Sequence, residues 1–228
     1  MLIRDATADR DAAACAEIYA PYVSDTVISL EERAPGETEL ADRIRATTKT
    51  HRWLVAEEAQ EVIGYAYAGA HRTRACYRWA TDVAVYVSPA HQRRGVGRAL
   101  YETLFPLLAA QGLRIACAGI TLPNDASVGL HEALGFRPVG VYRNIGFKHG
   151  AWRDVGWWQL ELGGADGHPP EPGPPTRLAG APDRAADRVW QRALAKSANQ
   201  SSSSSSASVG QASTARRASP TRSGGTSD

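Results

Sequence analysis

The hydrophobic and polar positions of residues 1–162 follow two spacings, and the changes between them predict the order of the secondary structure. Apolar residues that recur every three to four positions predict helices, whereas alternation or short apolar runs predict strands. Helices are expected over 7–22, 36–49, 97–111 and 124–134, and strands over 2–6, 53–58, 62–72, 81–89, 113–121, 136–143 and 154–162. This order predicts an α/β fold with a mixed sheet and helices on both of its faces.

The expected helix at 97–111 has the clearest apolar stripe. Leu100, Leu104, Leu107 and Leu108 follow the i, i+4, i+7, i+8 spacing of a helix face that packs on a core. Pro106 lies inside this stretch and has no N–H for the helical hydrogen bonds. We therefore expect Pro106 to kink the helix or to shorten it.

The composition changes after residue 162. A Pro/Gly-rich stretch is followed by a Ser-rich stretch with scattered arginines, and neither has enough apolar residues to offset the entropy of ordering. A short helix is expected between them, over 183–198. We therefore expect one folded domain over 1–162 and a disordered, low-complexity tail over 163–228.

Charge and cysteine content exclude several classes of protein. The formal net charge is +2, and its basic surplus lies in the tail, so the domain is nearly neutral and is not expected to bind nucleic acid. Cys15, Cys76 and Cys117 are too scattered for a disulfide framework or a zinc site. The N-terminus has no secretion signal, and no apolar run approaches the ~20 residues that span a bilayer. We expect a cytoplasmic protein without a membrane partner.

A candidate anion site follows the strand at 81–89. The segment Gln92-Arg93-Arg94-Gly95-Val96-Gly97 opens the long helix. The first turn of a helix has unpaired N–H groups and partial positive charge, and glycines let a phosphate approach the backbone. The spacing matches neither the ATP-binding nor the NAD-binding glycine loop. The residues alone leave two alternatives, a phosphate cradle and a solvated loop with a helix cap.

Two motifs identify the family that the chain resembles. Q-x-x-G-x-G at Gln92–Gly97 and the run from Asn124 to Phe136 resemble the coenzyme-binding motifs of the GCN5-related N-acetyltransferases. The segment 146–150, followed by Trp152 and Asp154, is more specific and resembles the phosphinothricin N-acetyltransferases and methionine sulfoximine acetyltransferases. The resemblance covers nearly all of residues 1–162 and none of the tail.

The resemblance implies a mostly antiparallel central sheet, acetyl-CoA as co-substrate, no metal, and a homodimer with a small-molecule amine as substrate. It implies that Asn124 bonds the pantetheine arm of acetyl-CoA. The other coenzyme contacts that it implies are Val85, Tyr86, Val87, Arg93, Arg94, Gly95, Val96, Gly97 and Arg98.

Acetyl transfer to an amine requires a base, because most amino acid amines are protonated near pH 7. Strand alternation places Asp82 and Tyr86 on one face, and the resemblance places the catalytic carboxylate at Asp82. The subgroup has glutamate there, so the side chain is one methylene shorter and an activated water can bridge the gap. A backbone N–H at or near Val87 is expected to polarise the thioester. The alternative for Asp82 is a carboxylate that caps a neighbouring loop.

His131 is the second catalytic candidate. The phosphinothricin subgroup has histidine at this place, and an imidazole that titrates near neutrality suits proton transfer. The alternative is a helix histidine whose ring bonds a backbone carbonyl.

Arg72, Arg74 and Tyr77 are the substrate-binding candidates. They lie in an expected loop between two strands, and arginine recognises carboxylate or phosphinate with two hydrogen bonds. The alternative is a solvated basic loop. Ser29 stands where the herbicide-detoxifying enzymes have phenylalanine, so an aromatic wall of their pocket is expected to be missing.

Together these features predict acetyl transfer from acetyl-CoA to the α-amine of a small amino acid analogue, without a covalent enzyme intermediate. The substitutions at 29 and 82 leave two alternatives open. One is acetylation of another amine, such as a polyamine, an antibiotic or a peptide N-terminus. The other is a non-catalytic acetyl-CoA-binding module.

Overall fold

A seven-stranded sheet in the order β1-β2-β3-β4-β5-β7-β6 forms the centre of the computed structural model, which describes residues 1–163, 169–176 and 178. All neighbouring strands are antiparallel except β4 and β5. The predicted mixed, mostly antiparallel sheet is therefore confirmed. The strands are β1 (Leu2–Asp5), β2 (Trp53–Glu58), β3 (Glu61–Ala70), β4 (Ala80–Val87), β5 (Ile115–Leu122), β6 (Arg137–Lys148) and β7 (Ala151–Glu161).

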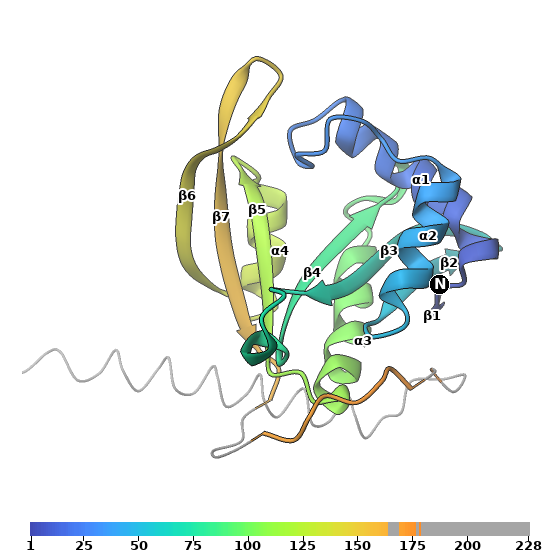
Figure 1. The fold of residues 1–228 in the computed structure, drawn as a ribbon. Coiled ribbons are helices and arrows are strands. Elements are labelled where there is room, and N and C mark those ends of the chain that lie inside the picture. The colour runs from blue at the N-terminus through green and yellow to red at the C-terminus, as the bar shows by residue number, and fades with distance from the viewer. Residues whose placement is uncertain (164–168, 177, 179–228) are drawn as a thin grey trace, which may run out of the picture.

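Helices cover both faces of this sheet (Figure 1). α1 (Ala8–Ser24) and α2 (Glu37–Thr47) pack on one face, and α3 (Val96–Gln111) and α4 (Asp125–Ala133) pack on the other. Two short 3-10 turns, η1 (Ala75–Tyr77) and η2 (Pro89–His91), flank β4. Each face has its own hydrophobic core, and β4 contributes Val83, Val85 and Val87 to one and Tyr86 to the other.

α3 forms because its apolar stripe fits the sheet. Leu100, Leu104 and Leu108 are fully buried, and truncating one of them to alanine costs about 2–5 kcal/mol of stability. The helix continues through Pro106 to Gln111, so the predicted shortening does not occur.

β4 and β5 are hydrogen-bonded to each other over only the first part of their length. Their parallel ladder has three pairs and ends at Asp82–Cys117, although β4 continues to Val87 and β5 to Leu122. Figure 1 shows the two strands diverging beyond this point. We call the space between 83–87 of β4 and 118–122 of β5 the fork.

β6 and β7 form a longer hairpin than the sequence predicted. They join through a two-residue turn at His149 and Gly150, whose φ angles are +48° and +72°. Positive φ at both positions matches the twist of antiparallel strands, as in a type I′ turn. The expected strands at 136–143 and 154–162 missed this extension, because His-Gly is a weaker turn signal than Asn-Gly.

The segment after the sheet contacts the domain. Gly173 N–H donates to the Gln111 carbonyl (2.8 Å), and Leu178 N–H donates to Asp5 Oδ2 (2.8 Å). The buried Arg52 guanidinium donates to the carbonyl of Thr176. These residues belong to the segment that its composition predicted to be disordered, and they instead pack against the domain.

Two further expectations concern parts of the tail that lie outside the described residues. These are the short helix at 183–198 and the disorder expected from residue 179 onward. Within the described ranges, every helix is too short or too polar to cross a bilayer.

Candidate active site

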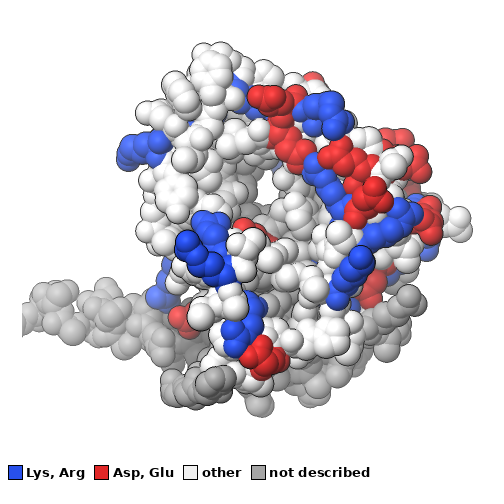
Figure 2. Space-filling view, in the orientation of Figure 1, with Lys and Arg blue, Asp and Glu red and all other residues white. Residues whose placement is uncertain are grey.

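The fork exposes backbone hydrogen-bonding groups of β4. Ser88 N–H donates to the Ile63 carbonyl (2.9 Å) on β3. Backbone N–H and C=O groups alternate in direction along an antiparallel ladder, so those of Val83, Val85 and Val87 point away from β3 and toward β5. At this height β5 has already diverged and does not pair with them. Figure 2 shows a hollow between the β5–β7 part and the part formed by α1 and β4. The fork is therefore an opening lined by backbone donors and acceptors.

Tyr22 of α1 closes one end of the fork. Its hydroxyl donates to the Val87 carbonyl (2.6 Å) and accepts from Gln92 Nε2 (3.0 Å). Val87 N–H also lies 3.4 Å from this hydroxyl oxygen. The donor expected to polarise the thioester thus faces Tyr22, a residue that the sequence pattern did not single out.

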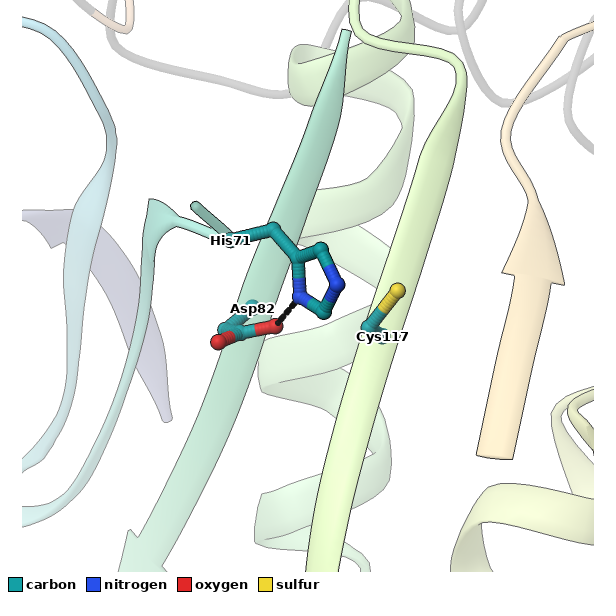
Figure 3. A group of neighbouring side chains, drawn as sticks. All are labelled: His71, Asp82 and Cys117. Atoms are coloured by element: carbon teal, nitrogen blue, oxygen red, sulfur yellow. Dashed lines mark hydrogen bonds and ion pairs between the residues drawn. The ribbon is translucent and has the colours of Figure 1, made fainter. Parts of the chain in front are cut away.

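Asp82 lies where the fork begins, on the same sheet face as α1. Its carboxylate Oδ1 is 2.6 Å from Nδ1 of His71, the first residue after β3 (Figure 3). The Asp82 side chain is 39% exposed and that of His71 is 17% exposed. Burial raises the pKa of Asp82, while the His71 contact and the charge of Arg72 oppose the shift. Asp82 therefore has an engaged, partly desolvated carboxylate rather than a solvated one.

Cys117 of β5 completes a group of three possible metal ligands. Donor atoms of His71, Asp82 and Cys117 all lie within 4.8 Å of one another. Two ligands at ~2.0–2.1 Å from a tetrahedral zinc would be about 3.3 Å apart, so the 2.6 Å His71–Asp82 contact is a hydrogen bond and not a preformed metal site. Burial, with the Asp82 charge, raises the pKa of the Cys117 thiol to about 11. At neutral pH it is a thiol and a poor nucleophile.

The predicted anion loop has the backbone that such a loop requires. Arg93 and Gly95 adopt positive φ angles of +59° and +80°, and α3 starts at Val96 without a side-chain cap on its first turn. A Cβ at Gly95 would meet nothing within 4 Å, so the approach to these N–H groups is open. A non-glycine residue at positive φ is strained, and such strain gathers at functional sites.

The arginines of this loop differ in their partners. Arg94 pairs with Glu58 (3.0 Å) and Arg98 pairs with Glu102 (2.8 Å). No ion pair or hydrogen bond joins the Arg93 guanidinium to another described residue. Arg93 is therefore the arginine that is most available to an incoming anion.

α4 places Asn124 and His131 on the face opposite to Asp82. Asn124 caps the helix, its Oδ1 accepting from Ser127 N–H (3.1 Å). His131 is 4% exposed, and its Nδ1 lies 2.7 Å from the Ser127 carbonyl. Its Nε2 lies 3.2 Å from the Tyr101 hydroxyl. Burial lowers the pKa of His131, and the Ser127 carbonyl only partly opposes this, so the ring is held neutral.

The three substrate candidates line a cavity of about 400 Å³ beside η1. Arg72, Arg74 and Tyr77 contribute to its wall, and Glu171 and Pro172 of the C-terminal segment close it. Asp82 does not line it. Arg72 also lies over the Trp157 ring (5.9 Å), beside the His71–Asp82 pair, so Arg72 lies between the cavity and the fork.

Ser29 is buried in a polar network. Its hydroxyl lies 2.7 Å from the Tyr19 hydroxyl, which donates to Glu31 Oε1 (2.9 Å). The Arg43 guanidinium bonds both Glu31 oxygens and holds the pKa of that carboxyl below its usual range. Figure 2 shows the interleaved basic and acidic side chains of this part of the surface. At Ser29 the structure therefore has a network of hydrogen-bonded polar side chains where an aromatic wall was expected to be missing.

His71 is a second residue of this site that the sequence pattern missed. The pairing of Ala70 with Thr81 puts His71 just beyond a hairpin end, within reach of Asp82. The two strands were predicted, but their register was not, and a shift of one residue would turn the ring to the other face.

Comparisons with known proteins agree with this geometry. The chain matches a family model described as an acetyltransferase (GNAT) domain over residues 3–157. It is 42% identical over 160 residues to a phosphinothricin N-acetyltransferase of Streptomyces viridochromogenes, covering 70% of this chain and 87% of that protein. It is 39% identical over 109 residues to an L-methionine sulfoximine/L-methionine sulfone acetyltransferase of Salmonella typhimurium, covering 48% and 64%.

A solved structure shows the same fold with coenzyme. It is a GNAT superfamily phosphinothricin acetyltransferase from Sinorhizobium meliloti in complex with AcCoA, 38% identical, with a TM-score of 0.71, covering 77% of this chain and 96% of that one. The fork, the uncapped α3 and the match over residues 3–157 lead to one conclusion: the chain belongs to the GCN5-related (GNAT) acetyltransferases.

Proposed function

We propose that this acetyltransferase moves the acetyl group of acetyl-CoA directly to the α-amine of a small amino acid analogue of the phosphinothricin or methionine sulfoximine type. The observation that carries the proposal is the end of the β4–β5 ladder at Asp82, which puts a half-buried carboxylate at the mouth of the fork. The names of the relatives supply the substrate class.

The fork and the α3 loop suit the two ends of acetyl-CoA. The first-turn N–H groups of α3, with Arg93, Arg94 and Arg98, would hold the pyrophosphate, because these donors have no cap and Gly95 leaves the approach open. Val85 and Val87 direct backbone groups into the fork, where they can pair with the amides of the pantetheine arm. Val96 and Gly97 form the start of α3. Tyr86 packs on the sheet face that α1 and α2 cover. The Asn124 side chain caps α4, beside the proposed path of the pantetheine arm.

The reaction needs a base and a route for the proton of the leaving thiolate. Asp82, engaged by His71, is the proposed base, directly or through water. His131 is the second candidate for proton transfer. Its part requires one of its two hydrogen bonds to open, because both ring nitrogens already have partners.

For substrate binding we propose Arg72, Arg74 and Tyr77. Arg72 lies beside Asp82, so a substrate carboxylate or phosphinate on its guanidinium would bring the α-amine near the base. The Ser29 hydroxyl, engaged in its network with Tyr19 and Glu31, supplies no aromatic wall, so the preferred amine within this class need not be phosphinothricin itself.

We also propose that the protein is a cytoplasmic homodimer with no nucleic-acid or membrane partner. The β6–β7 hairpin exposes large apolar side chains, including Ile145, Phe147 and Trp152, the last 61% exposed, and a second copy would cover them. Trp158 is buried in the core and is unavailable to such a contact.

The test is acetyl-CoA turnover against a panel of amines. It contains phosphinothricin, methionine sulfoximine, methionine sulfone, ordinary amino acids and polyamines. We expect the highest kcat/KM among the first three, at least tenfold above spermidine. A preference for polyamines would move the protein to another substrate class. Tight acetyl-CoA binding without turnover of any amine would favour a non-catalytic module.

A further inference from the structure

We propose that His71 accepts the proton of the amine, with Asp82 holding its ring, so that the two side chains act together as the base. This inference rests on the proposed acetyl transfer, and it reassigns the atom that receives the proton from the Asp82 carboxylate to Nε2 of His71.

The imidazole ring of His71 is held in one orientation. Nδ1 lies 2.6 Å from Asp82 Oδ1. The ring also makes edge contacts with Trp157 of β7 (centroids 5.8 Å apart) and with Tyr77 of η1 (6.1 Å). These contacts come from three elements on different sides of the ring. A base held in this way loses little entropy when it meets its substrate.

The same contacts define the free nitrogen. An ionised carboxylate only accepts hydrogen bonds, so Nδ1 bears the hydrogen and Nε2 has the lone pair. No described residue hydrogen-bonds Nε2. Figure 3 shows this nitrogen turned away from Asp82 and toward Cys117 of β5, which lies opposite Asp82 at the start of the fork. The lone pair thus points across the start of the fork, the side on which we place the thioester and the amine.

An imidazole suits this proton better than a carboxylate does. The ordinary histidine pKa is ~6.5 and that of aspartate is ~3.9, and a general base works best when its pKa is near the working pH. The Asp82 charge would stabilise the imidazolium once it forms, as in other aspartate–histidine pairs. The short aspartate side chain reaches the ring of His71, and the ring then extends the pair toward the fork.

The proposed step balances in protons and bonds. The substrate ammonium gives one proton to Nε2 of His71 and becomes a neutral amine. Its nitrogen then forms a bond to the acetyl carbon as the carbon–sulfur bond of acetyl-CoA breaks. The departing thiolate takes the second nitrogen proton, and the imidazolium returns its proton to water.

The pH dependence of the step depends on the charges around the pair. The described titratable or charged groups that face it come from β3, the β3–η1 loop, η1 and β5: Tyr67, Arg72, Tyr77 and Cys117. Cys117 stays a thiol at neutral pH because its pKa is raised to about 11. Burial raises the pKa of Tyr67 to about 12, so it is neutral as well. An acid limb of kcat/KM that depends on His71 is therefore assigned to the pair.

His71→Asn separates the two possible bases. The asparagine amide can still donate to Asp82 in the position of Nδ1, but nothing replaces Nε2. We expect kcat/KM to fall by about 10²–10⁴-fold and the acid limb to disappear, with the acetyl-CoA Kd changed less than about twofold. His149→Asn is the matched control, since His149 is exposed at the positive-φ turn where asparagine fits, and it should leave kcat/KM unchanged.

The opposite result overturns the inference. If His71→Asn keeps kcat/KM within about threefold and retains the acid limb, the carboxylate is itself the base and His71 only positions it. A second variant, His71→Gly, allows a chemical-rescue experiment. Added imidazole should restore turnover in it, and failure of that rescue, with acetyl-CoA binding intact, also counts against His71.

A spectroscopic readout keeps this test apart from that of the proposed function. If no amine of the panel is acetylated, the proposed function fails. ¹⁵N NMR of His71 then still tests whether the His71 ring is held by Asp82 as proposed. A neutral ring with its hydrogen on Nδ1, which shifts in Asp82→Asn, agrees with the inference. A neutral ring with its hydrogen on Nε2 overturns it.

Discussion

Two histidines lie in this enzyme on opposite faces of one sheet, and their surroundings differ in almost every respect. His131 is 4% exposed, with a carbonyl on one ring nitrogen and a tyrosine hydroxyl on the other. His71 has a carboxylate on one nitrogen and no described partner on the second. Burial lowers the pKa of His131, whereas the His71 ring lies 2.6 Å from the Asp82 carboxylate.

The difference shows what a motif can and cannot identify. His131 lies within a recognisable run on α4, so the sequence singled it out as an acid–base residue. Its environment is that of a packed side chain with both nitrogens occupied. His71 belongs to no motif, yet it has the carboxylate, the fixed ring and the free lone pair that a base requires. Acid–base function depends on the contacts of a residue more than on its residue type.

The largest effect is expected at Asp82. Asp82→Ala removes the base or its support, so kcat/KM should fall by about 10²–10⁴-fold while the acetyl-CoA Kd changes little. Steady-state kinetics and calorimetry would measure the two quantities. Glu17→Ala, an exposed carboxylate in mid-α1, is the matched control. Unchanged turnover in Asp82→Ala would exclude Asp82 and its pair with His71 from the acid–base chemistry.

His131→Phe should act mainly on stability. It leaves the Tyr101 hydroxyl and the Ser127 carbonyl without their partner, at a cost of about 1–3 kcal/mol in the free energy of unfolding. Urea unfolding and kcat at a temperature where the variant is folded would separate stability from chemistry. A stable variant with a tenfold or larger loss of kcat would instead place His131 in proton transfer.

The burial of His131 should also make the stability of the protein depend on pH. Because its folded pKa is lowered, His131 contributes stability that is present above its unfolded pKa of ~6.5 and is lost as the pH falls from there toward the folded pKa. The free energy of unfolding should therefore drop between pH 7 and pH 5.5, and this drop should be smaller in His131→Phe. Equal slopes for the two proteins would show that the buried ring does not govern acid stability.

A smaller effect is expected in the anion loop. Arg93→Ala should weaken acetyl-CoA binding about fivefold, in a salt-dependent manner, because Arg93 has no described counter-ion. Arg94→Ala should weaken it less, since Arg94 already pairs with Glu58. Titration at low and high salt would measure both. A larger effect in Arg94 than in Arg93 would contradict the ranking by partners.

The smallest effect is expected from truncation. Removing 179–228 should leave Tm and kcat/KM unchanged, whereas removing 164–228 should lower Tm by a few degrees, because it strips the partners of the buried Arg52 and of Asp5. Thermal unfolding of both truncated proteins would test this. Identical Tm values would show that the packed residues 169–176 and 178 add no stability.

The sequence by itself determined the fold class, the order of the elements, the place of the candidate anion loop and the strand position of Asp82. Those features depend on local spacing: 3.6-residue stripes such as Leu100–Leu104–Leu108, alternation along β4, and glycines where a helix starts. Only the tertiary structure decided which side chains meet. The register of β3 against β4 brings His71 to Asp82, α4 packing buries His131, and the β4–β5 ladder ends where Asp82 faces Cys117. Such contacts join residues far apart in the chain, and a one-residue change of register would undo them without altering any local pattern.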